Sequence, residues 1–214
     1  MENVNSYHNI EYIVVENNSV LDETFAGYET MEKKYGDRFR LVKWDGGFNY
    51  SAINNYGIQY AKGEYILLLN NDTEVIEPDS LRRMLAICQR SEVGIVGAKL
   101  LYDDNTVQHA GIVMGYQGVA GHAFTGIGDD VYGYFARAVL TQELSAVTAA
   151  CLLTKRSVFE QVGKLDETFE VAFNDIDYCM KVREAGYKII YEPHAKLHHY
   201  EYKSRGAEDT GKKQ

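Results

Sequence analysis

The chain has 214 residues, of which 45% are hydrophobic and 25% charged, and its formal net charge is −9. This is the composition of a globular protein, and at roughly 150 residues per domain we expect one large domain. The acidic excess argues against a nucleic-acid partner, because such binding needs clustered Lys and Arg. The three cysteines have no metal-ligand spacing and are expected to be buried thiols in a reducing compartment. No apolar run approaches the roughly 18 residues of a membrane span and the start is polar, so we expect a cytoplasmic protein.

Short apolar runs alternate with helix-forming segments through the first half of the chain. The predicted strands are Tyr12–Val15, Arg40–Trp44, Tyr65–Leu69 and Gly94–Leu101. The predicted helices are Phe25–Tyr35, Tyr50–Ala61 and a segment after Pro78 in which Leu81, Met84, Leu85 and Cys88 share one face. This alternation predicts βαβ units, and therefore an α/β fold with a mostly parallel central sheet flanked by helices.

The second half is less regular. A hairpin is predicted between Lys99–Tyr102 and Val107–Met114, followed by an irregular, glycine- and aromatic-rich segment, Gly115–Tyr134. The later expected elements are a strand at Ala146–Thr154, a short helix whose capping box begins at Ser157, a helix at Asn174–Ala185 and a strand at Tyr187–Tyr191. Residues 1–206 are expected to form a single domain, with a flexible tail at residues 207–214.

Polar side chains follow two of the predicted strands, where parallel sheets bind their ligands. Glu16 comes directly after the first strand and could accept hydrogen bonds from a base or ribose, although taken alone an exposed glutamate in a turn explains it better. Asp72 follows the third strand after two asparagines. Mg²⁺ and Mn²⁺ prefer oxygen ligands of this kind, whereas an Asx turn ahead of Pro78 would need no ligand. The pattern leaves both interpretations of Asp72 open.

The start of the late helix carries two more carboxylates. Asn174 or Asp175 is a natural N-cap there, because short polar side chains accept hydrogen bonds from the free amides. Asp175 could instead act as a general base toward an acceptor hydroxyl. Asp177 lies two residues further on, so the two carboxylates point apart on a helix and make a poor chelate.

Histidines form two groups along the chain. His194, His198 and His199 follow the last predicted strand, and one of these imidazoles could share a metal ion with the carboxylate that follows the third strand. His109 and His122 lie in the middle segment without evident partners and are interpreted as structural.

Six stretches together resemble the family 2 glycosyltransferases with the GT-A fold, of the type that assembles bacterial surface polysaccharides. They are Tyr12–Ser19; Phe48–Ser51 with Asn54–Asn55; Ala61–Tyr65 running into Leu69–Asp72; Gln108–Gly111; Val162–Glu167; and Asn174–Cys179 followed by Gly186–Tyr187. The resemblance runs from about Asn9 to Gly206. It implies a nucleotide-binding half joined to an acceptor half.

The resemblance implies roles for individual residues. The residues expected to bind the nucleotide are Glu16 at the base, Asn18, Asn49 near the diphosphate and Asn71 at the ribose. Asp72 is expected to hold Mn²⁺ or Mg²⁺, together with His199 or its close rival His198. Asp175 stands at the position of the catalytic base.

These roles imply a single inverting displacement. The donor would be a nucleoside-diphosphate sugar, and the acceptor a hydroxyl of a glycan or of a lipid-linked acceptor. Lipid-linked acceptors are compatible with a cytoplasmic enzyme at the inner face of the cell membrane. The sequence does not indicate an oligomeric state.

Three departures from the family pattern bear on this interpretation. The family's first strand and its Pro-x-Tyr-Asn-like turn have no counterpart before Tyr12, which indicates N-terminal truncation. Asn174 replaces the usual Glu beside the base, and Glu16 replaces the commoner Asp. The alternative is therefore a non-catalytic remnant that binds sugar or nucleotide, or a partner through Gly115–Tyr134. A nucleotidyltransferase would need a basic glycine-rich loop at its start, which the sequence lacks.

Overall fold

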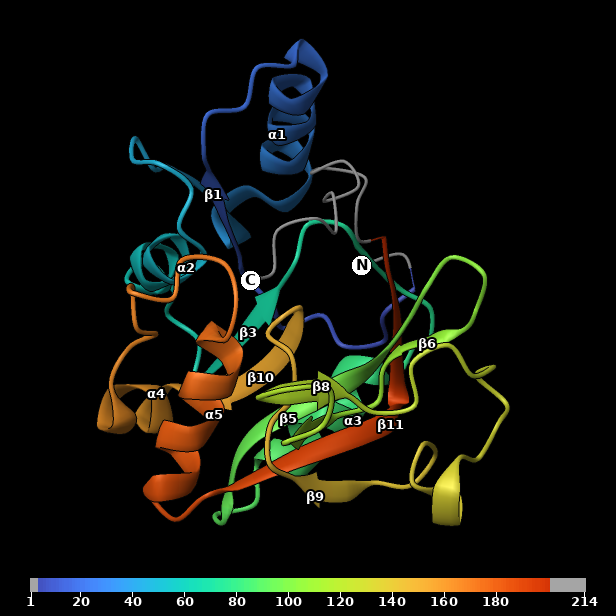
Figure 1. The fold of residues 1–214 in the computed structure, drawn as a ribbon. Coiled ribbons are helices and arrows are strands. Elements are labelled where there is room, and N and C mark those ends of the chain that lie inside the picture. Colours follow the sequence, from blue (N-terminus) through green and yellow to red (C-terminus); the bar gives the residue numbers. More distant parts are fainter. Residues whose placement is uncertain (1–3, 201–214) are drawn as a thin grey trace.

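Three sheets organise residues 4–200, the part of the chain that the computed structural model describes (Figure 1). The strands are β1 (Tyr12–Glu16), β2 (Phe39–Lys43), β3 (Tyr65–Leu69), β4 (Thr73–Val75), β5 (Val93–Leu101), β6 (Val107–His109), β7 (Ile112–Met114), β8 (Ala120–His122), β9 (Gln142–Leu144), β10 (Cys151–Lys155) and β11 (Lys188–His199). The α-helices are α1 (Asp22–Tyr35), α2 (Tyr50–Ile58), α3 (Ser80–Cys88), α4 (Arg156–Val162) and α5 (Asn174–Glu184). Two 3₁₀ turns, η1 (Gly36–Arg38) and η2 (Tyr134–Ala136), complete the chain order.

The central sheet has seven strands. Its main order is β3-β10-β5-β11-β4, with β6 paired to β5 and β9 paired to β11. The strands β5 and β11 are parallel, whereas β10 runs antiparallel to both β3 and β5, and β4 runs antiparallel to β11. β1 and β2 form a separate parallel pair, and β7 and β8 an antiparallel one. The α/β class is therefore as predicted, and β10 reverses direction because it follows the long irregular segment rather than a crossover helix.

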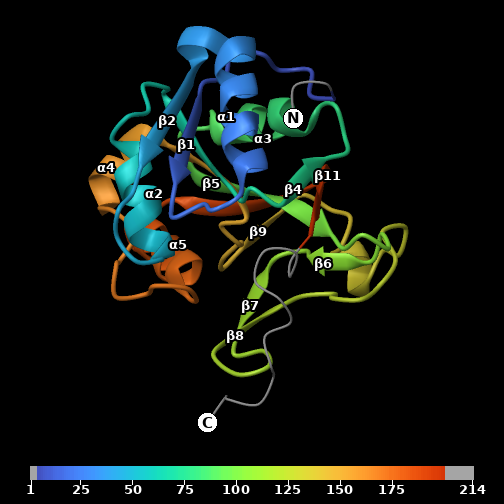
Figure 2. The same cartoon turned by 90° about the horizontal axis from the view of Figure 1, so that it is seen from above.

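Helices cover both faces of the central sheet (Figures 1 and 2). Leu81, Met84 and Cys88 of α3 pack into one apolar cluster with alternate residues of β5, including Val96. On the opposite face, α4 and α5 pack against a second cluster that contains Ile95. Every residue of β5 is buried, which explains its continuous apolar sequence. The predicted apolar face of α3 is thus confirmed.

Two predicted helix caps are wrong, although α5 begins at Asn174 as predicted. The N-cap of α4 is Lys155, without a side-chain cap, because the helix begins directly where β10 ends, so the capping box at Ser157 does not form. The N-cap of α5 is Phe173, in the left-handed region with φ of 66°, rather than Asn174 or Asp175. Both of those polar residues lie inside the first turn of α5.

The predicted strands need four corrections. β11 extends to His199 because the chain passes Pro193 with a register shift between Glu192 and Lys196 and then continues pairing. β4 was not predicted; it pairs with the distant end of β11. The predicted strand Ala146–Thr154 divides, and only its second part lies in β10. Within Gly115–Tyr134, β8 folds back on β7.

Two expectations from composition can be compared with the described residues. All three cysteines are free and buried, as predicted, and burial raises the pKa of Cys88 and Cys151 to about 12. None of the helices within residues 4–200 has the length and apolarity to span a bilayer. The predicted tail, residues 207–214, lies outside the described residues.

A substitution of Gly111, which lies between β6 and β7, tests how closely the middle segment packs against Leu144. Its φ is +98°, and a Cβ atom there would come within 2.0 Å of Leu144 Cδ1. We expect Gly111→Ala to lower the free energy of unfolding by about 2 kcal/mol or more, from overpacking and backbone strain. Gly115→Ala is the control. The φ of Gly115 is +78°, but no atom lies within 4 Å of a Cβ there, so only backbone strain should lower the free energy of unfolding. Equal losses in urea unfolding would contradict the packing argument.

Candidate active site

The loop after β3 and the first turn of α5 meet at the start of β10. The backbone N–H of Asn70 donates to the carbonyl oxygen of Ala150 at 3.0 Å. The backbone N–H of Ala149 donates to Asp175 Oδ2 at 3.3 Å. Because Ala149 and Ala150 are adjacent, the segment that carries Asp72 and the helix that carries Asp175 lie at the same end of β10.

Asp72 lies beside His199. Asp72 Oδ1 is 3.2 Å from His199 Nε2, and their side chains are 18% and 10% exposed. The pairing of β4 with β11 fixes this position, since His199 lies opposite Thr73 and the Tyr200 N–H donates to the Asp72 carbonyl oxygen at 2.8 Å. Gln108 supports the ring from the other side, with Oε1 2.7 Å from His199 Nδ1.

The hydrogen bonds of His199 indicate which of its nitrogens has a lone pair to offer. The oxygen Gln108 Oε1 can only accept, so His199 Nδ1 carries the proton in the neutral ring. Nε2 is then an acceptor, which lies 3.2 Å from Asp72 Oδ1 and accepts from Asn70 Nδ2 at 3.2 Å. Asp72 Oδ1 is buried and has no hydrogen-bond partner among the described residues. Two acceptors 3.2 Å apart are the donor set that a divalent cation takes.

The fit to a metal ion is limited to two protein ligands. No group of three or more His, Cys, Asp or Glu side chains that could hold a metal occurs within residues 4–200. Mg²⁺ and Mn²⁺ commonly take one or two carboxylates and complete their coordination with substrate phosphates and water. The pair Asp72–His199 therefore fits a cation that is shared with a phosphate-bearing substrate.

The other late histidines lie elsewhere. His198 is the neighbour of His199 on β11, so its side chain points to the opposite face, where Nε2 lies 3.0 Å from Asn105 Oδ1. His194 is exposed near the bulge of β11. The structure therefore places His199, and not His198, beside Asp72. The prediction that these residues follow the last strand is wrong, because all three lie within β11.

Asp175 is held by three hydrogen-bond donors. Besides the Ala149 N–H, the Ile176 N–H donates to Oδ1 at 2.8 Å, and the Thr148 hydroxyl donates as well. Burial nevertheless raises the pKa of Asp175 above its ordinary value, since it outweighs these donors and the field of His122. A fixed carboxylate with a raised pKa is the chemistry expected of a general base.

The predicted nucleotide-binding residues Glu16 and Asn18 lie where β1 ends. Glu16 is buried, and its Oε1 accepts from the Ser19 N–H at 2.6 Å. Asn18 has φ of +57° and donates from Nδ2 to the Gly46 carbonyl oxygen at 3.3 Å. Glu16 is thus not the exposed turn residue of the simpler interpretation.

Asn71 and Asn49 are positioned differently. Asn71 is exposed in the turn between β3 and β4. Asn49 is the N-cap of α2: its Oδ1 accepts from the Ala52 N–H at 2.9 Å, while its Nδ2 donates to the Glu167 carbonyl oxygen at 2.8 Å. These bonds give Asn49 a structural role, and its contact with a diphosphate stays a prediction.

The helix α2 is fastened to the segment that leads into α5. Ser51 Oγ donates to the Phe169 carbonyl oxygen at 2.8 Å. Asn55 is buried and makes a reciprocal pair with Leu165, donating to its carbonyl oxygen at 2.9 Å and accepting from its N–H at 3.1 Å. These bonds, together with those of Asn49, form what we term the α2 clasp, which joins α2 to residues 165–169.

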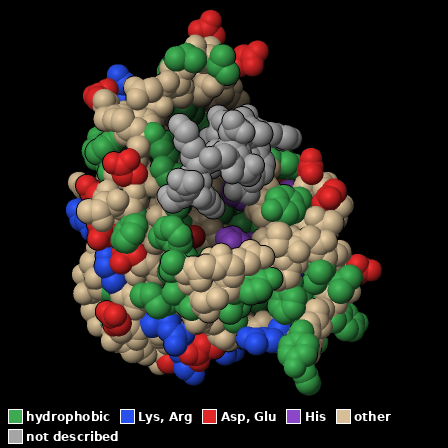
Figure 3. Space-filling view, viewed as in Figure 1, with side chains coloured by type: hydrophobic (Ala, Val, Ile, Leu, Met, Phe, Trp, Pro, Cys, Tyr) green, Lys and Arg blue, Asp and Glu red, His purple; other side chains and the backbone are tan. Residues whose placement is uncertain are grey.

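Sequence reasoning missed several residues that complete the site. Gln108 holds His199, Thr148 holds Asp175, and His109 and His122 contact each other. The sequence predicted Gln108–Gly111 only as part of the family resemblance. The residues that contact Gln108 and His109, which are His199 and Thr148, lie far from them in the chain. The available signal was two consecutive polar residues, Gln108 and His109, in an otherwise apolar run. Figure 3 shows histidine side chains at the centre of one face of the molecule.

Comparison with known proteins places the chain in one family. The family model "Glycosyl transferase family 2" matches residues 2–163, so the chain belongs to this family. Asp175 and His199 lie beyond the matched residues.

Known proteins resemble the chain over most of its length. It is 49% identical over 97% of its residues to "Uncharacterized protein y4gI" of Sinorhizobium fredii, and 39% identical over 94% to "O-antigen biosynthesis protein RfbC" of Myxococcus xanthus. It spans only 23% and 16% of the length of these two relatives. Among solved structures, a mannosyltransferase of Pyrobaculum calidifontis in complex with GDP-Man and Mn²⁺ has a TM-score of 0.66 at 16% identity, covering 96% of this chain and 52% of that chain. This likeness confirms the predicted GT-A fold.

Proposed function

We propose that this chain transfers a sugar from a nucleoside-diphosphate sugar to a hydroxyl of a glycan or lipid-linked acceptor, with inversion and with Mn²⁺ or Mg²⁺ as cofactor. The observation that carries the proposal is the buried pair of acceptors Asp72 Oδ1 and His199 Nε2, which lies at the same end of β10 as Asp175. Membership of glycosyl transferase family 2 supports the reaction class. The relative named for O-antigen biosynthesis supports a role in cell-surface polysaccharide assembly, at the inner face of the cell membrane.

The donor would lie across the ends of β1 and β3. Glu16 and Asn18 contact the nucleoside, Asn71 the ribose, and Asn49 lies toward the diphosphate. A divalent cation held by Asp72 and His199 supplies positive charge against the leaving diphosphate. Positioning of the two substrates and this electrostatic support account for most of the expected rate.

Asp175 performs the proton transfer. The carboxylate accepts the proton of the acceptor hydroxyl as that oxygen bonds to the anomeric carbon, and the bond from this carbon to the diphosphate oxygen breaks with its electron pair. Attack from the side opposite the leaving group inverts the configuration. The N–H groups of Ala149 and Ile176 hold the carboxylate in place for this step.

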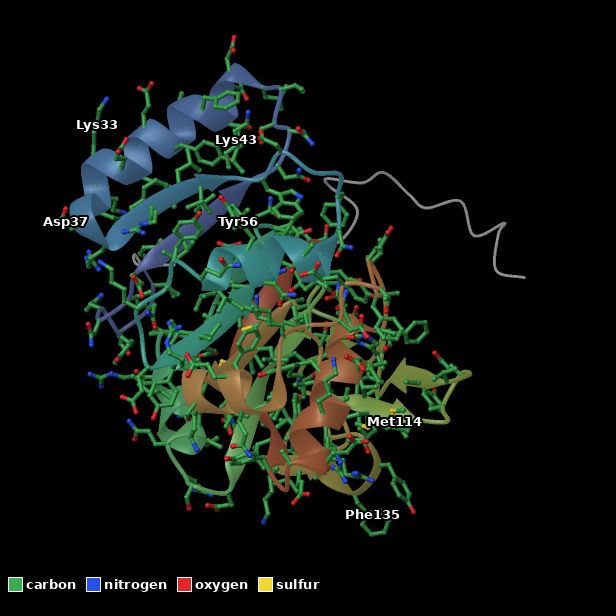
Figure 4. The ribbon with its side chains drawn as sticks, turned by 90° about the vertical axis from the view of Figure 1, so that its left-hand side faces the viewer. Lys33, Asp37, Lys43, Tyr56, Met114 and Phe135 are labelled. Carbon is green, nitrogen blue, oxygen red and sulfur yellow. The ribbon has the colours of Figure 1, made fainter. Side chains whose placement is uncertain are left out.

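Loss of the Asp72 carboxylate tests the metal assignment. We expect Asp72→Asn to weaken the Mn²⁺-dependent binding of UDP or GDP by about tenfold or more, because it removes the only negative ligand of the pair. Isothermal calorimetry with each nucleotide, in MnCl₂ and in EDTA, measures this loss. Asp37→Asn is the matched control, since Asp37 is exposed in η1, which follows α1 (Figure 4). Unchanged Mn²⁺-dependent affinity in Asp72→Asn would refute the metal site.

A second candidate function has one observation in its favour. β1 and β2 form a sheet of their own, and within the described residues β1 pairs only with β2, and β3 only with β10. Glu16 therefore lies on a sheet separate from the one that carries His199, and this separation favours a remnant that binds without catalysing transfer. Heat of nucleotide binding with no transfer to any acceptor would support the remnant.

A further inference from the structure

The turn that leads into β10 is held by bonds from several other elements. Residues 148–150 lie outside the strands, and Ala149 and Ala150 are 3% and 6% exposed, so their backbone polar groups need partners inside the protein. The Ala150 carbonyl oxygen accepts from the Asn70 N–H, and the Ala149 N–H donates to Asp175 Oδ2. The Ala149 carbonyl oxygen is the group whose partner has not yet been described.

Tyr50, the first residue of α2, supplies that partner. Its hydroxyl donates to the Ala149 carbonyl oxygen at 3.0 Å. Its backbone N–H donates to the Glu170 carbonyl oxygen at 2.7 Å, on the segment that leads into α5. The side chain packs against the apolar cluster that contains Ile95. Tyr50 is therefore fixed at both ends, and it connects α2 with the turn that holds Asp175.

The Tyr50 hydroxyl keeps its proton, so it can act as this donor. Burial first, and then the negative charge of Asp175, raise the pKa of Tyr50 above the ordinary value of about 10. A carbonyl oxygen can only accept, so the proton lies between Tyr50 Oη and Ala149. Ala149 is thus held at both of its backbone polar groups, by Tyr50 at the carbonyl and by Asp175 at the N–H.

We propose that Tyr50 is a positioning residue for sugar transfer: its hydroxyl fixes Ala149, and the Ala149 N–H in turn fixes the carboxylate of Asp175. The proposal rests on the proposed function, because it assumes that Asp175 is the base. A buried carbonyl that loses its donor carries a free-energy penalty, so without the hydroxyl the turn moves to find another partner. Because α2 also carries Asn49, the donor side of the site and the base are aligned through one side chain.

The loss of this alignment has a signature in the titration of Asp175. The bond from the Ala149 N–H lowers the pKa of Asp175, so weakening it raises that pKa, because the charged carboxylate loses a donor. The other titratable groups that interact with Asp175 are unchanged by a substitution of Tyr50. His122 on β8 lowers the pKa of Asp175, and Cys179 of α5 is neutral because burial raises the pKa of its thiol.

Kinetics of Tyr50→Phe, which removes the hydroxyl and keeps the ring, test this role. The probes are UDP-, GDP- and dTDP-sugars with Mn²⁺ as donors and a panel of p-nitrophenyl glycosides as acceptors. We expect kcat to fall about three- to tenfold and its acid limb to move to higher pH by about half a unit or more, while the donor KM stays within about twofold. Tyr56→Phe is the matched control on α2 (Figure 4), because Tyr56 Oη lies 2.9 Å from Tyr60 Oη, and it should change neither quantity. An unmoved acid limb in Tyr50→Phe, or the same movement in both variants, would overturn the proposal.

Carboxyl NMR of the full chain labelled with ¹³C-aspartate measures the same shift without turnover. The Asp175 signal is identified by its absence from Asp175→Asn. We expect its titration midpoint to rise by about half a pH unit or more in Tyr50→Phe and to stay unchanged in Tyr56→Phe. An unchanged midpoint in Tyr50→Phe would refute the positioning role. Failure of the proposed function itself would show differently, as absent Mn²⁺-dependent binding of UDP or GDP in the unsubstituted chain.

Discussion

Asp175→Asn is expected to lower kcat for sugar transfer by about 10²- to 10⁴-fold, the usual contribution of a positioned general base. The amide has nearly the shape of the carboxylate but cannot take the acceptor proton. The binding of UDP or GDP with Mn²⁺ should remain within about twofold of the original value, since Asp72 and His199 are untouched. Initial rates with saturating donor and acceptor, combined with calorimetry, separate the two effects.

The pH dependence provides a second measure of the same residue. Asp175 must be deprotonated to act as a base, and its raised pKa means that kcat falls as the pH drops through that raised value, rather than through the ordinary pKa of about 3.9. The Asn variant should lose this acid limb. Asp177→Asn is the control on the same helix. Asp177 Oδ2 is paired with Lys181 Nζ at 2.7 Å, and the three groups that donate to Asp175 do not donate to Asp177. Equal losses of kcat in both variants would contradict the base assignment.

Asp129→Asn is expected to lower the free energy of unfolding by about 3–5 kcal/mol, because it leaves a buried ammonium without its carboxylate. Lys99 Nζ lies 2.6 Å from Asp129 Oδ1, and the Lys99 side chain is only 1% exposed. Lys196 Nζ contacts the other oxygen, Oδ2, at 2.7 Å. The carboxylate therefore ties the middle segment to β5 and β11. Urea unfolding followed by circular dichroism measures the loss.

A neighbouring residue offers a matched control for Asp129. Asp130→Asn changes an exposed carboxylate one residue further on and should alter stability by less than about 0.5 kcal/mol. Burial alone would raise the pKa of Asp129, but its bonds to Lys196 and Lys99 outweigh this and lower it. The stabilisation is therefore present above the unfolded pKa and is lost as the pH falls through the folded one. A similar loss in both variants would contradict the buried-pair argument.

The elements predicted from the sequence were those set by local patterns. The apolar stripe of α3 and the continuous apolar run of β5 predict their burial without knowledge of their neighbours. β4 and the second half of β11 were missed because they exist through pairing with each other over a long separation. Pro193 also hid the continuation of β11, since proline usually ends a strand and is tolerated here at a bulge.

The residues of the candidate site also divide into those that local patterns predict and those that depend on long-range contacts. Asp72 and Asp175 were identified from their positions after a strand and at a helix start, and the resemblance supplied their roles. The choice between His198 and His199 depended on which side of β11 each occupies, and that follows from a register that the sequence does not reveal. The partners Gln108 and Thr148 act across long separations in the chain, so no spacing rule could find them.

The α2 clasp has a mechanical consequence for how substrates would enter. Its hydrogen bonds join Asn49, Ser51 and Asn55 to residues 165–169. We therefore expect α2 and the segment that leads to Asp175 to move together as one piece. Movement on substrate binding is then expected outside this piece, for example in the loops that follow β1 and β2. A donor that displaces those loops would leave the distance between the clasped helix and the base unchanged.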